Sequence, residues 1–136
     1  MSDCIFCKIV QGEIPCEKVY EDRNVLAFMD IKPINKGHVL IVHKHHKRDL
    51  ADLSDEELSA VMRSVRMVAV AVKKATKADG FNIGMNNGSA AGQVVFHAHV
   101  HVIPRFANDG LQSWPEKECA QDEIASIAKN IRAALK

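Results

Sequence analysis

The chain has 136 residues, of which 47% are hydrophobic and 26% are charged. This length and composition are typical of a single folded domain and exclude an intrinsically disordered chain. Lys and Arg number 18 against 17 Asp and Glu, a formal net charge of +1, so no field of one sign would attract nucleic acid or an anionic membrane. The expected partners are therefore small molecules or other proteins.

The N-terminus and the cysteines indicate the compartment. The first residues lack the charged and apolar regions of a signal peptide, and no apolar run approaches the roughly 18 residues of a membrane helix. The chain has 4 cysteines, two of them spaced as Cys4-x-x-Cys7, and in such a chain this favours reduced thiols or a metal over disulfides. We expect a cytoplasmic protein.

Short elements are predicted in the first third of the chain. Residues 4–10 predict a short helical turn that ends before Gly12 and Pro15. Three further segments have the pattern of strands: residues 18–21, 25–29 and 38–42. The turn-forming residues 22–24 separate the first two, which should therefore form a hairpin.

The middle of the chain predicts one long helix. Ser54 and Glu57 have the spacing of a capping box at its start. Lysines at 73, 74 and 77 favour the negative end of the helix dipole, and Gly80 is the expected stop. Apolar residues at helical spacing form one face: Leu58, Val61, Met62, Val65, Val68 and Val72.

The last third predicts two strands and a terminal helix. Residues 81–86 and 94–104 have the pattern of strands, and a glycine-containing loop, residues 87–93, joins them. Residues 122–135 repeat apolar residues as a terminal helix does. Strands joined by short turns, with segregated helices, indicate an α+β fold around an antiparallel sheet. We expect one domain over residues 1–136.

Three histidines alternate along the last predicted strand. Because successive side chains of a strand point to opposite faces, His97, His99 and His101 should share one face. The residues between them are apolar and would pack on a helix: Ala98, Val100 and Val102. Chance surface or core placement suits a lone histidine better than this triplet, so we expect a chemical role.

Two interpretations of the triplet compete. Two histidines at i and i+2 on a strand can bind one zinc ion, which would make the triplet a catalytic metal site. However, a rise of about 3.3 Å per residue separates the outer two by roughly 13 Å, too far for one tetrahedral ion to hold all three. The alternative is a division of labour, in which one histidine is structural, one neutral imidazole is a nucleophile and one binds charge.

A polar loop precedes the histidines. Residues 86–93 offer two glycines, backbone N–H groups and amide donors, which can hold a phosphate and stabilise charge that develops on it. The chain lacks both glycine-rich nucleotide-binding patterns, G-x-x-x-x-G-K-[ST] and G-x-G-x-x-G. A bound nucleotide would therefore need other contacts.

Four segments together resemble the histidine triad (HIT) superfamily, in particular its Hint-like branch of nucleotide-binding hydrolases. The segments agree in order and spacing and run from about residue 4 to residue 105. They are Cys4–Val10 followed by Glu13-Ile14-Pro15, Ala27–Ile31, Gly37–Val42 and Gly92–Arg105. The last contains the H-φ-H-φ-H-φ-φ signature. The resemblance implies a five-stranded antiparallel sheet with one long central helix and a C-terminal helix outside the core, with sheets paired in a homodimer.

The resemblance also implies roles for individual residues. His99 would attack the α-phosphorus through Nε2 to form a nucleotidyl-histidine, which water then hydrolyses, and His101 and Gln93 would hold the phosphate oxygens. Asp30 would accept hydrogen bonds from ribose hydroxyls. The implied substrate-contacting set is Ile5, Phe6, Ile9, Asp30, Ile31, Asn86, Gly92, Gln93, Val94 and His101.

Two departures from the family pattern affect the site. Many Hint enzymes have a serine after the glutamine, where this chain has Val94, so a hydroxyl near the phosphate is missing. Relatives often have proline before Lys-x-His, where this chain reads His43-Lys44-His45-His46. Either His45 or His46 could therefore serve as a ligand there. The only tryptophan, Trp114, has no role that the sequence assigns.

The Cys4-x-x-Cys7 pair is a half-site for zinc, a redox pair, or two small core residues. A redox pair usually begins a helix after a strand, which this position does not offer. Some HIT relatives complete a structural Cys₂His₂ zinc site, and the resemblance implies Cys4, Cys7, His46 and His97 as its ligands here. A closed four-coordinate site is structural and leaves His99 free for chemistry. No organic cofactor is expected.

The leading functional hypothesis is a nucleotidyl hydrolase or transferase that acts on purine nucleoside 5′-phosphate derivatives such as phosphoramidates or adenylates. One alternative is a nucleotide-binding sensor or scaffold protein with little turnover, which Val94 motivates. Others are a dinucleoside polyphosphate hydrolase and a metallohydrolase built on the triplet.

Overall fold

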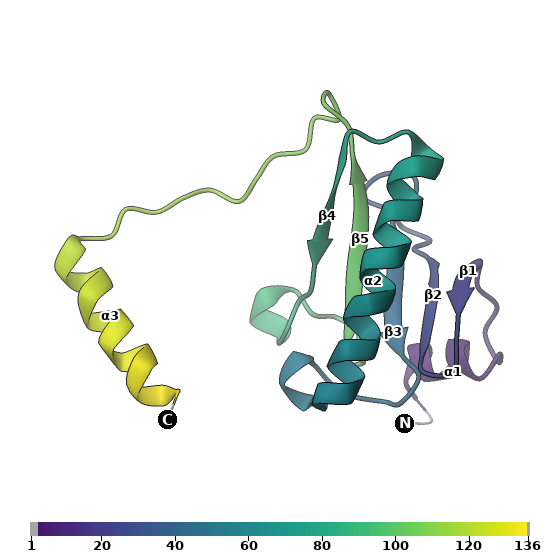
Figure 1. Cartoon of the computed structure of the whole chain (residues 1–136), viewed down its shortest axis with the longest axis horizontal. Helices are drawn as coiled ribbons and strands as arrows, with labels where there is room; N and C mark the ends of the chain where they lie inside the picture. Colours follow the sequence, from purple (N-terminus) through teal and green to yellow (C-terminus); the bar gives the residue numbers. More distant parts are fainter. Residues whose placement is uncertain (1–2, 136) are drawn as a thin grey trace.

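A computed structural model describes residues 3–135. Its five strands form one sheet in the order β1-β2-β3-β5-β4, and every neighbouring pair is antiparallel. Figure 1 shows α2 lying along one face of this sheet. The elements in chain order are α1 (Ile5–Val10), β1 (Lys18–Glu21), β2 (Val25–Met29), β3 (Val39–His43), the 3₁₀ turn η1 (Leu50–Asp52), α2 (Asp55–Thr76), β4 (Gly80–Gly84), the 3₁₀ turn η2 (Ser89–Ala91), β5 (His99–Arg105) and α3 (Gln121–Ala134). The expected α+β fold with a five-stranded antiparallel sheet and a long helix is confirmed.

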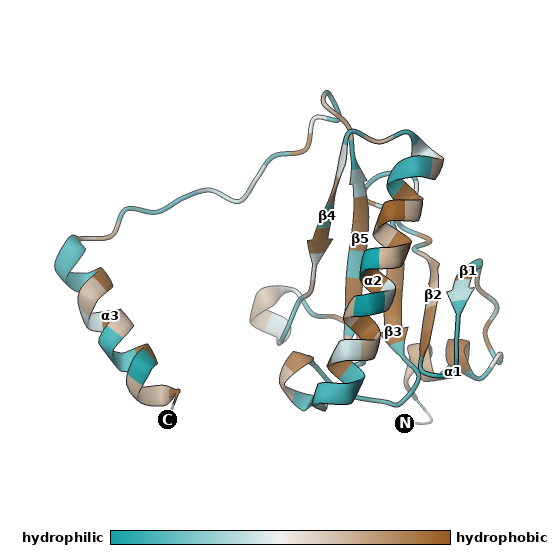
Figure 2. Ribbon diagram, viewed as in Figure 1, coloured by the Kyte–Doolittle hydropathy of each residue, from teal (hydrophilic) through white to brown (hydrophobic). Residues whose placement is uncertain are grey.

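Helix α2 packs its apolar face on the sheet, and Figure 2 shows hydrophobic and hydrophilic residues alternating along the helix. The predicted capping box is present: the Ser54 hydroxyl accepts from the Glu57 N–H, and the Glu57 carboxylate accepts from the Ser54 N–H. Each buried valine side chain stabilises the fold by roughly 1.5–3 kcal/mol. The main valines of this layer are Val61, Val65, Val68 and Val72 on α2 and Val25, Val39, Val100 and Val102 on the sheet.

The opposite face of the sheet carries α1 and the histidines. Phe6 of α1 packs there with Leu26, Phe28, Leu40 and Val42. In the β3–β5 pairing Leu40 faces His101 and Val42 faces His99. Cross-strand partners share a face, so His99 and His101 lie on the α1 side. Alternation places Val100 and Val102 toward α2, as predicted.

The structure corrects the predicted start of the last strand. It begins at His99 rather than at residue 94. The residues before it continue the period-two pattern but leave the sheet, because Ala98 N–H donates to the Lys47 carbonyl at 2.6 Å and the His97 ring points to the cysteines. His97 therefore precedes the strand that holds His99 and His101.

The end of α2 is also corrected. The helix ends at Thr76, and Lys77, not Gly80, takes the left-handed conformation at its C-terminus, with φ 57°. Gly80 is instead the first residue of β4, paired with Arg105, so the chain must leave the helix earlier. Met62, predicted for the buried face, is 44% exposed. The bounds of β3 and β4 each shift from prediction, by one residue and by one to two residues.

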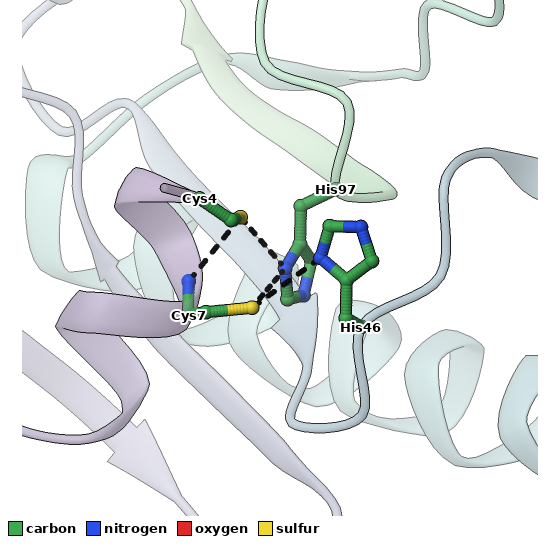
Figure 3. A group of neighbouring side chains, drawn as sticks. All are labelled: Cys4, Cys7, His46 and His97. Carbon is green, nitrogen blue, oxygen red and sulfur yellow. Dashed lines mark hydrogen bonds between the residues drawn. The ribbon is translucent and has the colours of Figure 1, made fainter. Parts of the chain in front are cut away.

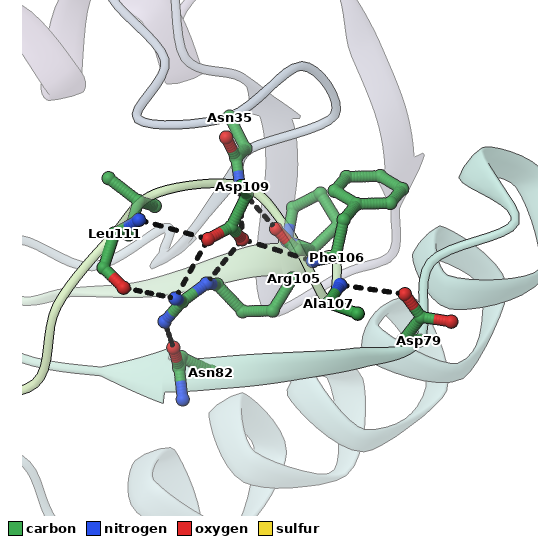
Figure 4. A network of polar contacts seen from close by, with 9 residues as sticks. Asn35, Asp79, Asn82, Arg105, Phe106, Ala107, Asp109 and Leu111 are labelled. Carbon is green, nitrogen blue, oxygen red and sulfur yellow. Dashed lines mark hydrogen bonds and ion pairs between the residues drawn. The ribbon is translucent and has the colours of Figure 1, made fainter.

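A polar network holds the chain where it leaves the sheet after β5 (Figure 4). The Arg105 guanidinium donates to both carboxylate oxygens of Asp109 at 2.8 and 3.1 Å. The Asp109 carboxylate also accepts from the Asn35 amide and from the Phe106 and Leu111 N–H groups. These donors hold the pKa of Asp109 well below its usual range. The network fixes the direction in which the C-terminal segment departs.

The C-terminal segment extends away from the sheet and its helices. Residues 111–120 are exposed and form no helix or strand, and α3 stands apart from the sheet in Figure 1. No residue of α3 is buried. Its apolar side chains, at helical spacing, lie in water: Ile124, Ile127 and Ile131 in the helix, and Leu135 at its cap. Over residues 3–135, no helix has the length and apolar character that crossing a bilayer needs.

Candidate active site

His99 is held in one tautomer by its neighbour. Its Nδ1 lies 2.8 Å from the His97 carbonyl oxygen, and because a carbonyl only accepts, Nδ1 carries the proton. Nε2 therefore carries a lone pair, and no residue within 3–135 donates a hydrogen bond to it. The Phe6 ring packs edge-on against the His99 ring at 5.0 Å. This arrangement can serve as a nucleophile.

Burial keeps His99 neutral. The side chain is 8% exposed, and burial lowers its pKa below the ordinary imidazole value, although the His97 carbonyl and Asp30 raise it in part. Burial also lowers the pKa of His101 to about 4, with the neighbouring imidazoles of His99 and His38 as smaller causes. Both rings are thus uncharged near pH 7. A neutral His99 keeps the lone pair on Nε2 that a nucleophile requires.

His101 has a partner that the sequence analysis missed. Its ring centroid lies 5.0 Å from that of His99, and its Nδ1 lies 2.9 Å from Nε2 of His38. His38 directly precedes β3 and is almost fully buried. The signal that could have found it is alternation along the predicted strand, which puts residues 38, 40 and 42 on one face.

Gln93 fixes the loop before the histidines. Its amide nitrogen donates to the Arg48 and Val95 carbonyls at 2.7 and 3.1 Å, and its amide oxygen accepts from the Gly88 N–H at 2.8 Å. A direct contact with phosphate would require these bonds to be given up. Gly92 has φ 94°, and a Cβ there would lie 3.3 Å from the Asn86 amide nitrogen. The loop conformation thus depends on glycine at this position.

Two cysteines and two histidines converge in one cluster (Figure 3). Cys4 and Cys7 come from α1 and its cap, His46 from the loop after β3, and His97 from the residue pair before β5. The His97 Nε2 donates to the His43 carbonyl at 2.7 Å, which leaves Nδ1 with a lone pair. That nitrogen faces the Cys4 and Cys7 sulfurs at 3.4 and 3.5 Å, and the His46 Nδ1 lies 3.3 Å from the Cys7 sulfur.

These distances suit a tetrahedral ion. With Zn–S bonds of about 2.3 Å and Zn–N bonds of about 2.0 Å, sulfur and nitrogen ligands of one zinc lie about 3.5 Å apart. Burial and the adjacent Cys4 thiol raise the pKa of Cys7 to about 11. His45 does not join this group. It is exposed and faces Glu57, its Nδ1 lying 3.4 Å from the carboxylate.

Comparison with known proteins decides the family. The family model for the HIT domain matches residues 11–108. The chain belongs to the HIT family. The adenosine 5′-monophosphoramidase of Schizosaccharomyces pombe is 39% identical over 135 residues, covering 98% of each chain. A crystal structure from Streptococcus mutans superposes with a TM-score of 0.94 at 44% identity, covering 100% of this chain and 87% of that one.

One structural relative contains zinc. A zinc-bound HIT protein from Mycobacterium smegmatis superposes with a TM-score of 0.78 at 36% identity, covering 97% of this chain and 98% of that one.

The match with the S. mutans protein covers this whole chain, so it includes α3. The resemblance stated from the sequence ended at residue 105 and missed this part.

The remaining predicted HIT site residues fall into two groups. Phe6 is buried core, and Ile9 packs partly against the same cluster. The exposed group is Ile5, Ile31 and Val94, with Ile31 91% exposed. Trp114, to which the sequence assigned no role, is 92% exposed. The Asp30 carboxylate accepts from the Lys32 N–H at 2.8 Å and lies 3.6 Å from Nε2 of His38. Asp30 thus closes a turn and faces the hydrogen-bonded pair of His38 and His101.

Proposed function

We propose that this chain is a nucleotidyl hydrolase or transferase that acts at the α-phosphate of purine nucleoside 5′-monophosphate derivatives, such as phosphoramidates and adenylates. The observation that carries the proposal is the fixed tautomer of His99, which leaves a lone pair on Nε2 in a ring whose centroid lies 5.0 Å from that of His101. The adenosine 5′-monophosphoramidase name of a relative 39% identical over nearly the whole chain supports the substrate class.

The reaction proceeds in two displacements at phosphorus. In the first, the His99 Nε2 lone pair forms a bond to the α-phosphorus as the bond to the leaving group breaks. The Nδ1–H bond to the His97 carbonyl stabilises the imidazolium that this step produces. In the second, water attacks the phosphorus, the P–N bond breaks, and the nucleoside monophosphate leaves. Histidine nucleophiles divide one difficult step into two easier ones in this way.

The substrate contacts follow from the same placement. His101 would donate to the phosphate oxygens. Because the Gln93 amide is hydrogen-bonded within the loop, Gln93 would position backbone N–H groups rather than contact the phosphate. Asp30 would accept from the ribose hydroxyls. The exposed apolar residues Ile5 and Ile31 would cover the purine with Ile9, and Asn86, Gly92 and Val94 would line the leaving-group side. Burial of Ile31 by the nucleotide would explain an isoleucine that is 91% exposed without it.

We also propose that Cys4, Cys7, His46 and His97 bind one structural zinc ion. Zinc would tie α1 and the loop after β3 to the start of β5, and it supplies folding free energy when bound. All four cysteines of the described chain are free thiols, which fits the cytoplasm as the compartment. His97→Ala should lower both zinc content and melting temperature, and His99→Ala should leave the zinc content unchanged. If losing His99 empties the site while losing His97 does not, the assignment is reversed.

A homodimer is the proposed assembly. The apolar stripe of α3, formed by Ile124, Ile127, Ile131 and Leu135, is exposed. Further apolar side chains are exposed on α2 and on the edge strand β4: Met62, Met67, Val70, Phe81 and Ile83. Exposed apolar faces of this kind mark association surfaces. A second copy would pair its sheet edge at β4 and cover α3.

The second candidate function is a nucleotide sensor with little turnover. Val94, 85% exposed beside Gln93, provides no hydroxyl where many relatives have serine. Calorimetry with AMP and a steady-state assay on adenosine 5′-phosphoramidate separate the two functions. An enzyme should turn over the phosphoramidate and lose turnover in His99→Ala. Tight AMP binding without turnover by the wild type would instead favour the sensor.

A further inference from the structure

The buried side chain of His38 has a hydrogen-bond pattern that leaves one choice of tautomer. It is 1% exposed, and the backbone N–H of Ile34 donates to its Nδ1 at 3.1 Å. A backbone N–H can only donate, so Nδ1 of His38 must carry a lone pair. The turn that presents Ile34 is itself held, since the His38 N–H donates to the Asn35 carbonyl and the Asp30 N–H donates to the His38 carbonyl.

The single proton of a neutral His38 must then lie on Nε2. Burial lowers the pKa of His38, so the ring is uncharged near pH 7 and holds one proton. A carboxylate oxygen of Asp30 lies 3.6 Å from Nε2, and its negative charge favours a proton on that nitrogen. Two independent contacts therefore agree on the same tautomer.

Nε2 of His38 lies 2.9 Å from Nδ1 of His101. Because the proton is on the His38 side, His38 is the donor and Nδ1 of His101 is the acceptor. We infer that His38 is a positioning residue: it holds His101 in the tautomer whose Nε2 carries the proton, and it fixes the plane of that ring. The hydrogen bonds thus form a chain with one direction: the Ile34 N–H donates to His38, His38 donates to His101, and His101 would donate to the ligand.

This order matters for the ligand because a phosphate oxygen is an acceptor. In the inferred tautomer His101 offers an N–H to that oxygen, as the stabilisation of charge developing on it requires. In the opposite tautomer His101 would present a lone pair and repel the oxygen. No residue within 3–135 donates to or accepts from Nε2 of His101, so this nitrogen is available. The value of the N–H for catalysis rests on the proposed function, whereas the direction of the hydrogen bond does not.

The direction can be measured on the wild-type protein without substrate. In ¹⁵N-histidine NMR, protonated and unprotonated ring nitrogens have well-separated shifts, and two-dimensional spectra correlate them with the ring protons. We expect an unprotonated Nδ1 and a protonated Nε2 for both His38 and His101. A protonated Nδ1 on His101, donating to an unprotonated Nε2 of His38, would overturn the inference.

Two substitutions test the consequence and separate donation from folding. His38→Gln carries its amide nitrogen as far from Cα as Nε2 of histidine and can still donate to His101. His38→Asn places an amide oxygen where Nδ1 was, which can still accept from Ile34, but it cannot reach His101. We expect kcat to fall at least about tenfold in His38→Asn with little change in KM, and to be largely restored in His38→Gln. The size is set by analogy with metal-bound histidines, where loss of the hydrogen-bond partner that orients the ring typically costs 10–100-fold.

The control is His45→Gln, because His45 is exposed and belongs neither to the Cys4–Cys7–His46–His97 group nor to the Asp30–His38–His101 group. Equal kcat in His38→Asn and wild type, with both folded, would contradict a positioning role. If the wild type has no turnover, the proposed function fails. The inference is then decided by the NMR tautomer of His101, which does not depend on activity.

Discussion

One ring nitrogen of each histidine in the triplet is occupied by a fixed partner, and the other is left for chemistry. His97 donates to the His43 carbonyl, His99 donates to the His97 carbonyl, and His101 faces His38. The nitrogens that remain differ accordingly: one faces two sulfurs, one holds a lone pair, and one is expected to carry a proton. Division of labour among three like residues thus depends on partners rather than on residue type.

The pH dependence of catalysis should reflect the burial of His99. Protonation of Nε2 removes the nucleophile, and burial lowers the pKa of His99 below its ordinary value of 6.5. The rate constant kcat/KM, which follows free-enzyme ionisations, should therefore be maximal near neutral pH and fall only below pH 6.5. The measurement needs a substrate whose phosphoryl group does not titrate between about pH 5 and 8. An acid limb centred above pH 6.5 would contradict a buried, neutral His99.

Much of the site could be predicted at this scale, and the reasons for the failures are physical. Alternation correctly placed His99 and His101 on one face and Val100 on the other. His38 was missed because alternation along the predicted strand gives the face of its side chain but not its partner, which lies 63 residues away. The choice between His45 and His46 could not be made either, because adjacent residues differ only in which way the loop turns them.

At the scale of elements, the sequence predicted the bounds best where turn residues or a helix cap mark them. The bounds of β1 and β2 match prediction because turn residues separate the strands, and α2 begins at its capping box. The predicted start of β5 at residue 94 was wrong. Residues 94–98 have the alternating pattern of a strand but lie outside the sheet, and they place the His97 ring beside the cysteines. The predicted end of α2 was wrong because Gly80, the expected stop, is the first residue of β4, and the helix ends before it at Thr76.

The left-handed residue at the end of α2 gives a stability prediction. Lys77 has φ 57°, a conformation that costs a non-glycine residue roughly 1–2 kcal/mol. Lys77→Gly should therefore raise the free energy of unfolding by about 0.5–1 kcal/mol, after the extra entropy of glycine in the unfolded chain is counted. Urea denaturation measures the change.

The matched control is Lys73→Gly, one turn earlier on the exposed side of the same helix. Glycine there should lower the free energy of unfolding by about 1 kcal/mol, since glycine is unfavourable inside a helix. Destabilisation by both substitutions would show that the left-handed conformation of Lys77 carries no strain.

At the scale of the whole molecule, the position of α3 is the feature that one chain does not explain. A 14-residue helix is marginal in water by itself, and its apolar stripe meets nothing within residues 3–135. The Arg105–Asp109 network directs the segment outward rather than back over its own sheet. A second copy is the proposed cover.

The dimer can be tested on the stripe. Ile127→Asp combined with Ile131→Asp should shift the protein from dimer to monomer in size-exclusion chromatography with light scattering, because buried charges at the interface are costly. The control is Ser126→Asp, on the opposite side of α3 and exposed, which should stay dimeric. A wild type that is monomeric at micromolar concentration would contradict the proposal.

The central claim is that His99 forms a bond to phosphorus, and trapping that bond tests it most directly. The protein is mixed with adenosine 5′-phosphoramidate, quenched during turnover in alkaline denaturant, because P–N bonds of histidine break in acid, and digested for mass spectrometry. We predict an adenylyl group on His99 in the wild type, and neither adduct nor turnover in His99→Ala. Turnover that persists in His99→Ala, or an adduct on another residue, would contradict the account.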